Sequence, residues 1–252
     1  MRPLQIARGR ADAHRVDVSG YAFAHGVRHT RATLLAWQRA PLAVVGRWLA
    51  GSALAATGLL AAVWLIATLD RSETAFLLRP PFVVGDGADV VDVLGRNLLV
   101  LALHAMACVA GFIAGSSLPL QASRRHGLSR WVHEHGGRLA IAFVVGATTF
   151  SLSAQAYLIG RALGRAAGYL GVAPGVLLFS VLPHALPELI ALFLPLAAWI
   201  IASRRGEWEQ LLAATFVTVA LDIPVLLAAA MSEVYVSPHL FAALTHIRAS
   251  KP

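Results

Sequence analysis

The 252-residue sequence has few charged residues and almost no cysteine. Asp, Glu, Lys and Arg together make up 13% of the chain, against roughly 25% in a typical soluble globular domain. This shortage of charge excludes a water-soluble globular protein. The single cysteine, Cys108, excludes a framework of disulfide bonds within the chain and does not identify the redox compartment.

Motifs of several enzyme classes are also missing. The chain has no H-E-x-x-H zinc motif and no G-x-x-x-x-G-K phosphate-binding loop. Ser151 and Ser153 have no histidine and acid at a spacing that indicates nucleophilic catalysis. A short histidine-rich segment could ligate a metal, but without cysteines a solvated loop is the simpler interpretation. We therefore predict no catalytic residue, no metal and no cofactor. The histidine-rich segment contains His126, His133, Glu134 and His135.

The chain is instead rich in apolar residues, which form 58% of it and give a mean hydropathy of +0.67. Too much apolar side chain is present for a disordered protein. Several runs reach the roughly 20 residues that a helix needs to cross a bilayer. We predict an all-α, polytopic membrane helix bundle with about five transmembrane helices. The runs are Pro41–Leu69, 97–118, 138–160, 172–202 and 210–231.

The formal net charge of +8 does not indicate a nucleic-acid partner, because the basic residues flank apolar runs and no nucleic-acid-binding signature is present. The first 41 residues carry seven Arg against two Asp, and segment 121–138 carries four Arg against one Glu. Segment 70–96 is acidic, with five acids against three Arg. The positive-inside rule then predicts a cytoplasmic N-terminus and an external C-terminus. Arg204 and Arg205 agree with this topology, whereas Arg161 and Arg165 do not.

We expect a basic cytoplasmic segment over residues 1–40, a transmembrane domain over 41–238 and a C-terminal tail over 239–252. The first apolar run begins too late, and is too long, for the apolar region of a cleaved signal peptide. Apolar residues before it recur at helical spacing and predict a helix at the membrane surface, although a frayed charged tail fits equally well. The apolar residues are Phe23, Val27, Leu34 and Trp37, with Arg28, His29 and Arg39 turned away.

The fourth apolar run is abnormal. Its 31 residues would extend ~46 Å as a helix, against a hydrocarbon core of ~30 Å. Its prolines lack backbone donors and oppose a straight helix, so we expect a broken or strongly kinked span. Non-helical backbone at membrane depth must be buried, so the part from Pro183 to Pro187 should face the bundle interior. The prolines are Pro174, Pro183, Pro187 and Pro195.

Ionisable side chains within the spans are costly and usually face the bundle. Counted from the turn near Gly206 along straight helices, Glu188 and Asp222 lie at nearly the same level, in the outer half of the membrane. We predict one polar cluster of five residues. These are His104, Gln155, His184, Glu188 and Asp222.

The predicted cluster has three interpretations. It is a hydrogen-bonded network that fixes helix packing, a passage for protons or solute, or the centre of a metal-dependent hydrolase. The spacing of His184 and Glu188 is a weak metal signature. Two further stripes lie at helical spacing: Ser180, His184 and Glu188 in the fourth run, and Thr215, Thr218, Asp222, Ala229 and Glu233 in and after the fifth.

Small residues at spacings that permit close helix approach occur in the first two runs. The approach is either within one chain or between two copies, so a homo-oligomer is compatible with the sequence. The glycines concerned are Gly51 and Gly58 in the first run, and Gly111 and Gly115 in the second.

Two segments resemble the stage II sporulation protein M family of bacterial membrane proteins. Segment 182–189, LPHALPEL, is similar to the family's leucine-proline-histidine-glycine stretch and following glutamate, with Ala185 in place of the glycine. Segment 226–238, LLAAAMSEVYVSP, resembles the family's ending of an apolar helix, a glutamate and a Ser-Pro pair. The matching positions are Asn97, Pro183, His184, Glu188, Glu233 and Pro238.

The resemblance covers residues 97–238, and its departures are those of a divergent member. It implies a membrane scaffold more than it implies sporulation. Family members in the founding system are membrane scaffolds that recruit peptidoglycan-degrading partners. We therefore expect a non-enzymatic scaffold or subunit of a complex in the bacterial cytoplasmic membrane, with the lipid bilayer and other membrane or cell-envelope proteins as partners. The alternatives are a transport subunit that uses the polar cluster, and an intramembrane enzyme or an accessory in peptide modification and export.

Overall fold

The computed structural model describes residues 18–70, 85–113 and 126–246. This part of the chain consists of helices and the turns between them, without a β-strand. Five of its helices are long and apolar enough to cross a membrane, which confirms the predicted all-α, multi-pass bundle. The helices are α1 Val18–Trp37, α2 Pro41–Leu69, α3 Gly87–Phe112, α5 Gly127–Leu170, α6 Pro174–Arg205, α7 Leu211–Met231 and α8 Ser237–Thr245, with a short 3₁₀ helix, η2, at Trp208–Gln210 and a π-helical turn, η3, at Ser232–Val236.

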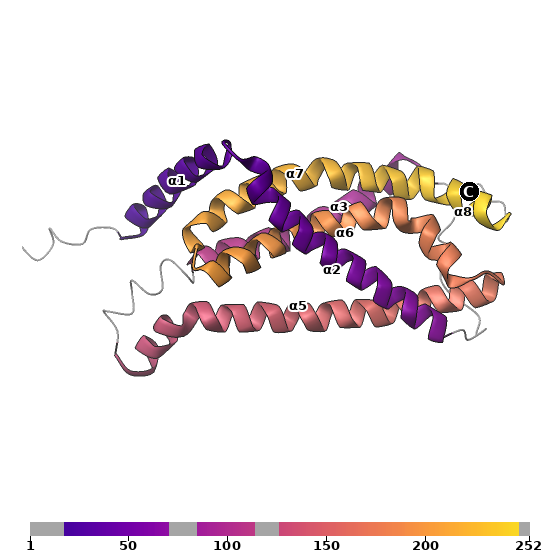
Figure 1. Ribbon diagram of the computed structural model, residues 1–252, viewed down its shortest axis with the longest axis horizontal. Coiled ribbons are helices and arrows are strands. Elements are labelled where there is room, and N and C mark those ends of the chain that lie inside the picture. Colours follow the sequence, from indigo (N-terminus) through magenta and orange to yellow (C-terminus); the bar gives the residue numbers. More distant parts are fainter. Residues whose placement is uncertain (1–17, 71–84, 114–125, 247–252) are drawn as a thin grey trace, which may run out of the picture.

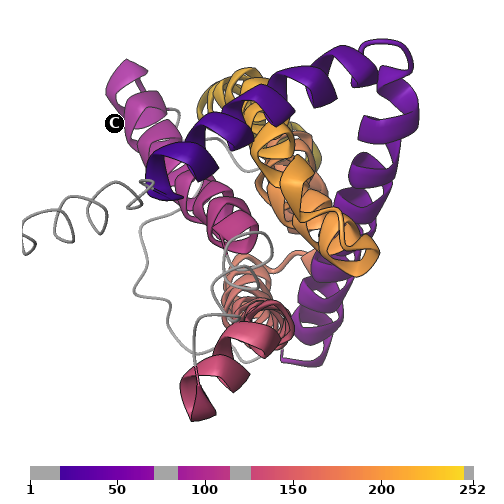
Figure 2. The ribbon, with the colours of Figure 1, turned by 90° about the vertical axis from the view of Figure 1, so that its left-hand side faces the viewer.

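Helices α6 and α7 form the centre of the bundle. Figure 2 shows α2 on one side of this pair and α3 on the other. Helix α5 runs along one edge, where α2 crosses it near its C-terminal end (Figure 1). In the most apolar 18-residue stretch of α6, 50% of the residues are buried, against 6% in the corresponding stretch of α5. The core therefore surrounds α6, and α5 is the most peripheral of the long helices.

Helix α3 begins ten residues before the predicted start of the second run, because Asp86 caps it. The Asp86 carboxylate accepts hydrogen bonds from the amides of Ala88, at 2.8 Å, and Asp89, at 3.3 Å. The Asp89 carboxylate accepts one from the Asp86 amide at 3.0 Å, which completes a capping box. Acids that we assigned to a connecting loop thus lie at the start of a helix.

Helix α5 is much longer than the predicted run 138–160. Its 44 residues extend ~66 Å, and the part suited to crossing the membrane is Ile141–Leu170. The first part of the helix bends away from the rest (Figure 1). Arg161 and Arg165, which we assigned to a connection, are helical residues in the last turns of α5.

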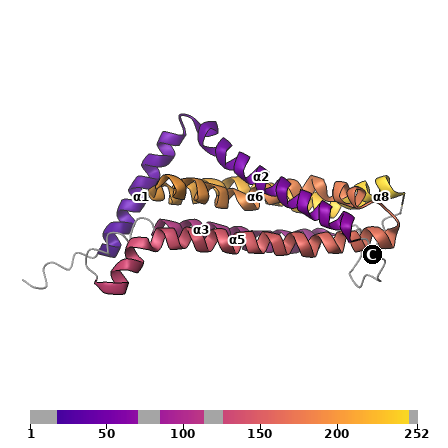
Figure 3. The same cartoon turned by 60° about the horizontal axis from the view of Figure 1, so that its bottom comes forward.

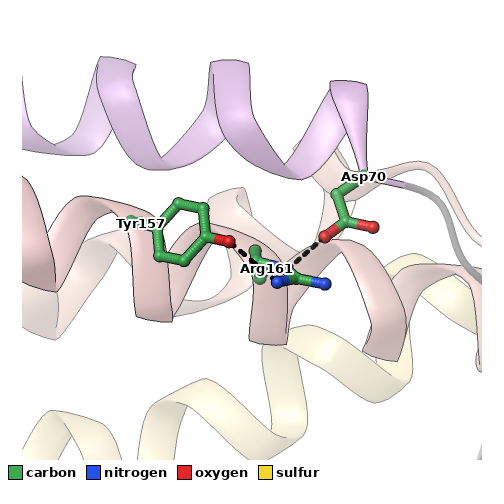
Figure 4. Close-up of polar contacts among 3 residues, drawn as sticks. All are labelled: Asp70, Tyr157 and Arg161. Carbon is green, nitrogen blue, oxygen red and sulfur yellow. Dashed lines mark hydrogen bonds and ion pairs between the residues drawn. The ribbon is translucent and has the colours of Figure 1, made fainter.

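Arg161 ties the end of α2 to α5. Its Nε donates to a carboxylate oxygen of Asp70 at 2.5 Å, and its Nη1 donates to the hydroxyl of Tyr157 at 2.8 Å (Figure 4). The guanidinium also lies over the Tyr157 ring, 5.4 Å from the ring centroid. An arginine that contradicts the positive-inside pattern is therefore neutralised by an acid on the neighbouring helix.

Helix α6 is continuous in spite of its internal prolines, so the predicted break into separate segments is not observed. Its ribbon bends near its N-terminal end instead, at the right of Figure 1. A bend accommodates a proline without ending the helix, and contacts with α2, α3 and α7 hold α6 in place. Pro183 is exposed, so the expectation that it faces the interior is wrong, because a helical backbone needs no such protection.

The fifth apolar run does not end at Met231. The helix continues through η3 and α8, and the stretch suited to crossing the membrane is Trp208–Thr245. Residues 239–245, which we expected to be tail, are helical. Phe241 is buried there against Ala167 of α5 and Leu177 of α6.

Helix α1 confirms the helix expected before the first span, and it lies at an angle to the bundle (Figure 3). The ring of Trp37 packs edge-on against that of Trp48, with 5.3 Å between centroids. His29 is not turned away, because its Nε2 lies 3.2 Å from a carboxylate oxygen of Glu209. The side chains of Phe23 and Val27 lie outside the described residues.

Two of the predicted small-residue positions make close contacts. A Cβ on Gly51 would touch Ala197 at 3.4 Å, and one on Gly111 would overlap the indole of Trp199. Gly58 has no described neighbour within 4 Å of such a Cβ, so it is not a packing site within the part of the chain that the structure describes. Gly115 lies outside the described residues. The closest helix approach was missed: Gly160 and Gly164 of α5 pack on α2, against Val63–Asp70.

Candidate functional site

A cavity of about 450 Å³ lies between α2, α5 and α6, and Glu233 of η3 also lines it. Most of its wall is aliphatic, from residues such as Leu59, Leu163 and Leu178. Polar side chains reach it from three elements. These are Gln155 of α5, His184 and Glu188 of α6, and Glu233 of η3.

Glu188 is the centre of the polar side of the cavity. Its carboxylate interacts electrostatically with Glu233 and with Arg96, and it faces the side-chain amide of Asn97. Asn97 is 9% exposed, and its Nδ2 has no hydrogen-bond partner among the described residues. Two acids and one amide from three helices therefore lie together here, and the exposed Arg96 of α3 acts electrostatically on both acids.

His184 connects α6 to α8. Its Nδ1 lies 2.7 Å from the hydroxyl of Ser237, which is 4% exposed. Ser237 precedes Pro238, which is also buried at the start of α8. The two segments that carry the family resemblance are thus in direct contact with each other.

Gln155 lies on the α5 side of the cavity and is exposed. Its Nε2 donates to the hydroxyl of Ser151, one turn earlier, at 3.1 Å. Gln155 therefore shares the cavity with His184 and Glu188, as the predicted cluster requires.

His104 has a different role from the one predicted. Its Nδ1 donates to the backbone carbonyl of Leu192 at 2.6 Å. One turn further along α3, the Sγ of Cys108 donates to the carbonyl of Pro195 at 3.2 Å. These bonds attach α3 to α6, and no hydrogen bond joins His104 to the polar cavity groups within the described part of the chain.

Asp222 is 1% exposed, and its Oδ2 has no hydrogen-bond partner within residues 18–70, 85–113 and 126–246. It does not line the cavity. Our estimate of its level assumed straight helices, but α6 bends and α7 continues into a π-helical turn. That turn brings Glu233, three helical turns beyond Asp222, to Glu188. Only Gln155, His184 and Glu188 of the predicted cluster are gathered at the cavity.

Three contributors were not predicted as members of the site. Arg96 was assigned to a loop, because the start of α3 was placed too late. Asn97 was noted only through the family resemblance, and Glu233 only through that resemblance and a stripe shared with Asp222. A π-helical turn has no simple sequence signal, although such turns are frequent at functional sites. The capping box of α3 was readable at Asp86 and Asp89 and would have placed Arg96 on a helix.

The described residues contain no group of three or more His, Cys, Asp or Glu side chains that could hold a metal ion. His126 occupies the N-cap position of α5 without a side-chain capping hydrogen bond, and the side chains of His133 and Glu134 lie outside the described residues. The cavity groups can accept hydrogen bonds, exchange protons and attract a cation. Comparison of the chain with models of protein families, with curated proteins and with solved structures finds no match.

Proposed function

We propose that this chain is a scaffold or subunit of a membrane protein complex in the bacterial cytoplasmic membrane, without enzymatic activity of its own. The family resemblance implies this role. The observation that supports it best is a stripe of small residues on α5, half of which no helix of the described residues covers. A partner helix from another protein, or from a second copy, would cover the remainder.

The stripe runs along one face of α5 at spacings of three and four residues. Ala156, Gly160 and Gly164 are buried against α2. Helix α2 then diverges from α5 (Figure 1), and the same face continues with exposed residues. A Cβ added to Gly146 would meet nothing within 4 Å. The exposed part consists of Gly146, Thr149 and Ser153.

Small residues of this kind drive association between membrane helices, because they let backbones approach closely. Lipid chains gain little from contact with hydroxyl groups, so a hydroxyl-bearing stripe favours a protein neighbour. The part of α5 that α2 covers also has small residues at spacings of three and four. A second helix on the remainder would repeat a contact that the chain already makes.

The test is affinity purification of the tagged protein in mild detergent, followed by mass spectrometry. Thr149→Leu and Ser153→Leu should each reduce recovery of a co-purifying partner roughly three- to tenfold, as expected for one lost helix contact. Thr57→Leu on α2 is the matched control. Both threonines are exposed, and each hydroxyl bonds a backbone carbonyl four residues earlier, at 2.7 Å for Thr57 and 2.8 Å for Thr149.

Equal recovery from the α5 variants and the control would contradict the use of this stripe. Recovery of the protein alone, as a monomer, from wild-type membranes would contradict the scaffold proposal itself. A self-associated form that is lost in Thr149→Leu would identify the partner as a second copy of the chain.

The second candidate is a transport subunit, which the cavity with His184, Glu188 and Glu233 favours. Carboxylates and imidazoles inside membranes are common relay groups. Under this alternative, Glu188→Gln abolishes proton or solute flux in proteoliposomes while partner recovery stays intact. Flux that is unchanged by Glu188→Gln would remove the transport alternative.

A further inference from the structure

We infer that the cavity between α2, α5 and α6 binds a single-chain amphiphile with an ammonium head group. The inference is independent of the proposed scaffold function, because it uses the cavity and not the uncovered stripe of α5. It assigns the apolar walls to the chain of the ligand and the two glutamates to its head.

The cavity has the size and lining of a ligand site. Small-molecule pockets measure about 300–1,000 Å³ and combine apolar walls with a few polar groups. This one, at about 450 Å³, lies near the lower end of that range, which favours one alkyl chain over two. Leu59, Val63, Leu163 and Leu178 supply apolar wall from three helices.

The charge of the polar side calls for a cation. Glu188 and Glu233 repel each other across the end of the cavity, and Arg96 is the base that interacts with both. Arg96 is itself shared with Asp92, whose carboxylate lies 3.7 Å from its guanidinium. Buried charge is costly unless it is paired. An ammonium group between the two glutamates would stabilise their ionised forms and donate hydrogen bonds to both.

Asn97 gives an independent indication that the polar side is incomplete. Its side chain is nine-tenths buried beside Glu188, yet its Nδ2 has no partner among the described residues. Buried polar groups in native proteins are nearly always hydrogen-bonded. A bound head group that draws the Glu188 carboxylate into place would let Asn97 complete its bond to that carboxylate.

The route of entry is from the side of α5. Gln155 and Ile159 both line the cavity, and both are exposed on the surface of the helix. In a membrane protein this surface faces lipid at the level of the spans. An amphiphile in the membrane can therefore reach the cavity laterally, with its chain against the leucines and its head toward Glu188.

The test uses the full-length protein in phosphatidylcholine nanodiscs with a photoreactive dodecylamine as the probe. Saturable labelling is expected on the cavity-lining peptides of α5 and α6. Unlabelled dodecylamine should compete, and dodecanol should not. The double variant Glu188→Gln/Glu233→Gln should raise the probe concentration at half-saturation at least about tenfold, because it removes charged hydrogen-bond partners. Glu207→Gln, which changes an acid outside this cavity, should leave labelling unchanged.

Equal competition by dodecanol, labelling that does not saturate, or unchanged affinity in the double variant would each overturn the proposal. Equal competition by phosphatidylethanolamine, which has two acyl chains, would overturn the assignment to an amphiphile with one alkyl chain. If the double variant does not fold, Ala162→Phe fills the apolar part of the cavity and must abolish the labelling. Labelling that persists in folded Ala162→Phe would overturn the proposal as well.

Discussion

Gly160, like Gly164, is a residue where α5 packs closely against α2. A Cβ on Gly160 would lie 2.7 Å from the Cβ of Ile66 and 2.9 Å from the carbonyl oxygen of Val63. The carbonyl belongs to helical backbone and cannot move aside alone. We expect Gly160→Ala to lower the free energy of unfolding in detergent by about 1–3 kcal/mol, as overpacking does in other proteins.

Gly58→Ala is the matched control for this substitution. Gly58 lies on α2, in the same pair of helices, but nothing is within 4 Å of an added Cβ there. Alanine has the higher helix propensity, so stability should stay the same or rise by up to about 1 kcal/mol. Chemical unfolding in one detergent measures both variants, and a Gly160→Ala protein as stable as Gly58→Ala would contradict the close contact.

The glutamate–histidine pair of the site could be predicted residue by residue. His184 and Glu188 are four apart, which places them on one face of any helix that contains both. Glu233 reaches the same cavity from η3, and Asn97 approaches Glu188 from α3, so both approaches depend on tertiary packing. His104 shows the limit of such reasoning. An ionisable side chain inside a span needs a hydrogen-bond partner, but for His104 that partner is the backbone carbonyl of Leu192 and not another side chain.

At the scale of the elements, the spans could be predicted because a membrane fixes a minimum apolar length. Their ends could not be predicted from hydropathy alone. Helix α3 starts in an acidic segment because Asp86 caps it, and α5 continues past Arg161 because Asp70 pairs with that arginine. The first contact is local and the second joins two helices, and in both cases the helix extends beyond its apolar run.

The prolines of α6 illustrate a similar limit. Each removes a backbone donor, which predicts a disturbance in the helix. It does not predict whether the helix bends or breaks. Packing against α2, α3 and α7 selects a bend over a break. The bend, together with the π-helical turn η3, aligns Glu188 with Glu233. The geometry of the site therefore depends on the bend of α6 and on η3. The local sequence pattern does not predict where either one directs the side chains.

At the scale of the whole molecule, the ends of the bundle are distinct. The His29–Glu209 pair holds α1 beside the turn between α6 and α7. The other end contains the starts of α3 and α6, since Asn97 faces Glu188 while Gly111 lies against Trp199 further along both helices. Any topology must therefore place α1 and the α6–α7 turn on one side of the membrane, and the start of α3 on the other.

The positive-inside rule predicts that the α1 side is cytoplasmic. We expect Gln38→Cys and Arg205→Cys to resist a membrane-impermeant maleimide in intact cells, and Ala88→Cys to be labelled, because all three positions are exposed in water-facing segments at the ends of helices. The native Cys108 is buried and bonded to the Pro195 carbonyl, so the wild-type protein should give no background. After permeabilisation all three variants should react. Labelling of Gln38→Cys and Arg205→Cys but not Ala88→Cys in intact cells would reverse the orientation, and labelling of only one of the first two would contradict the packing of α1 on the α6–α7 turn.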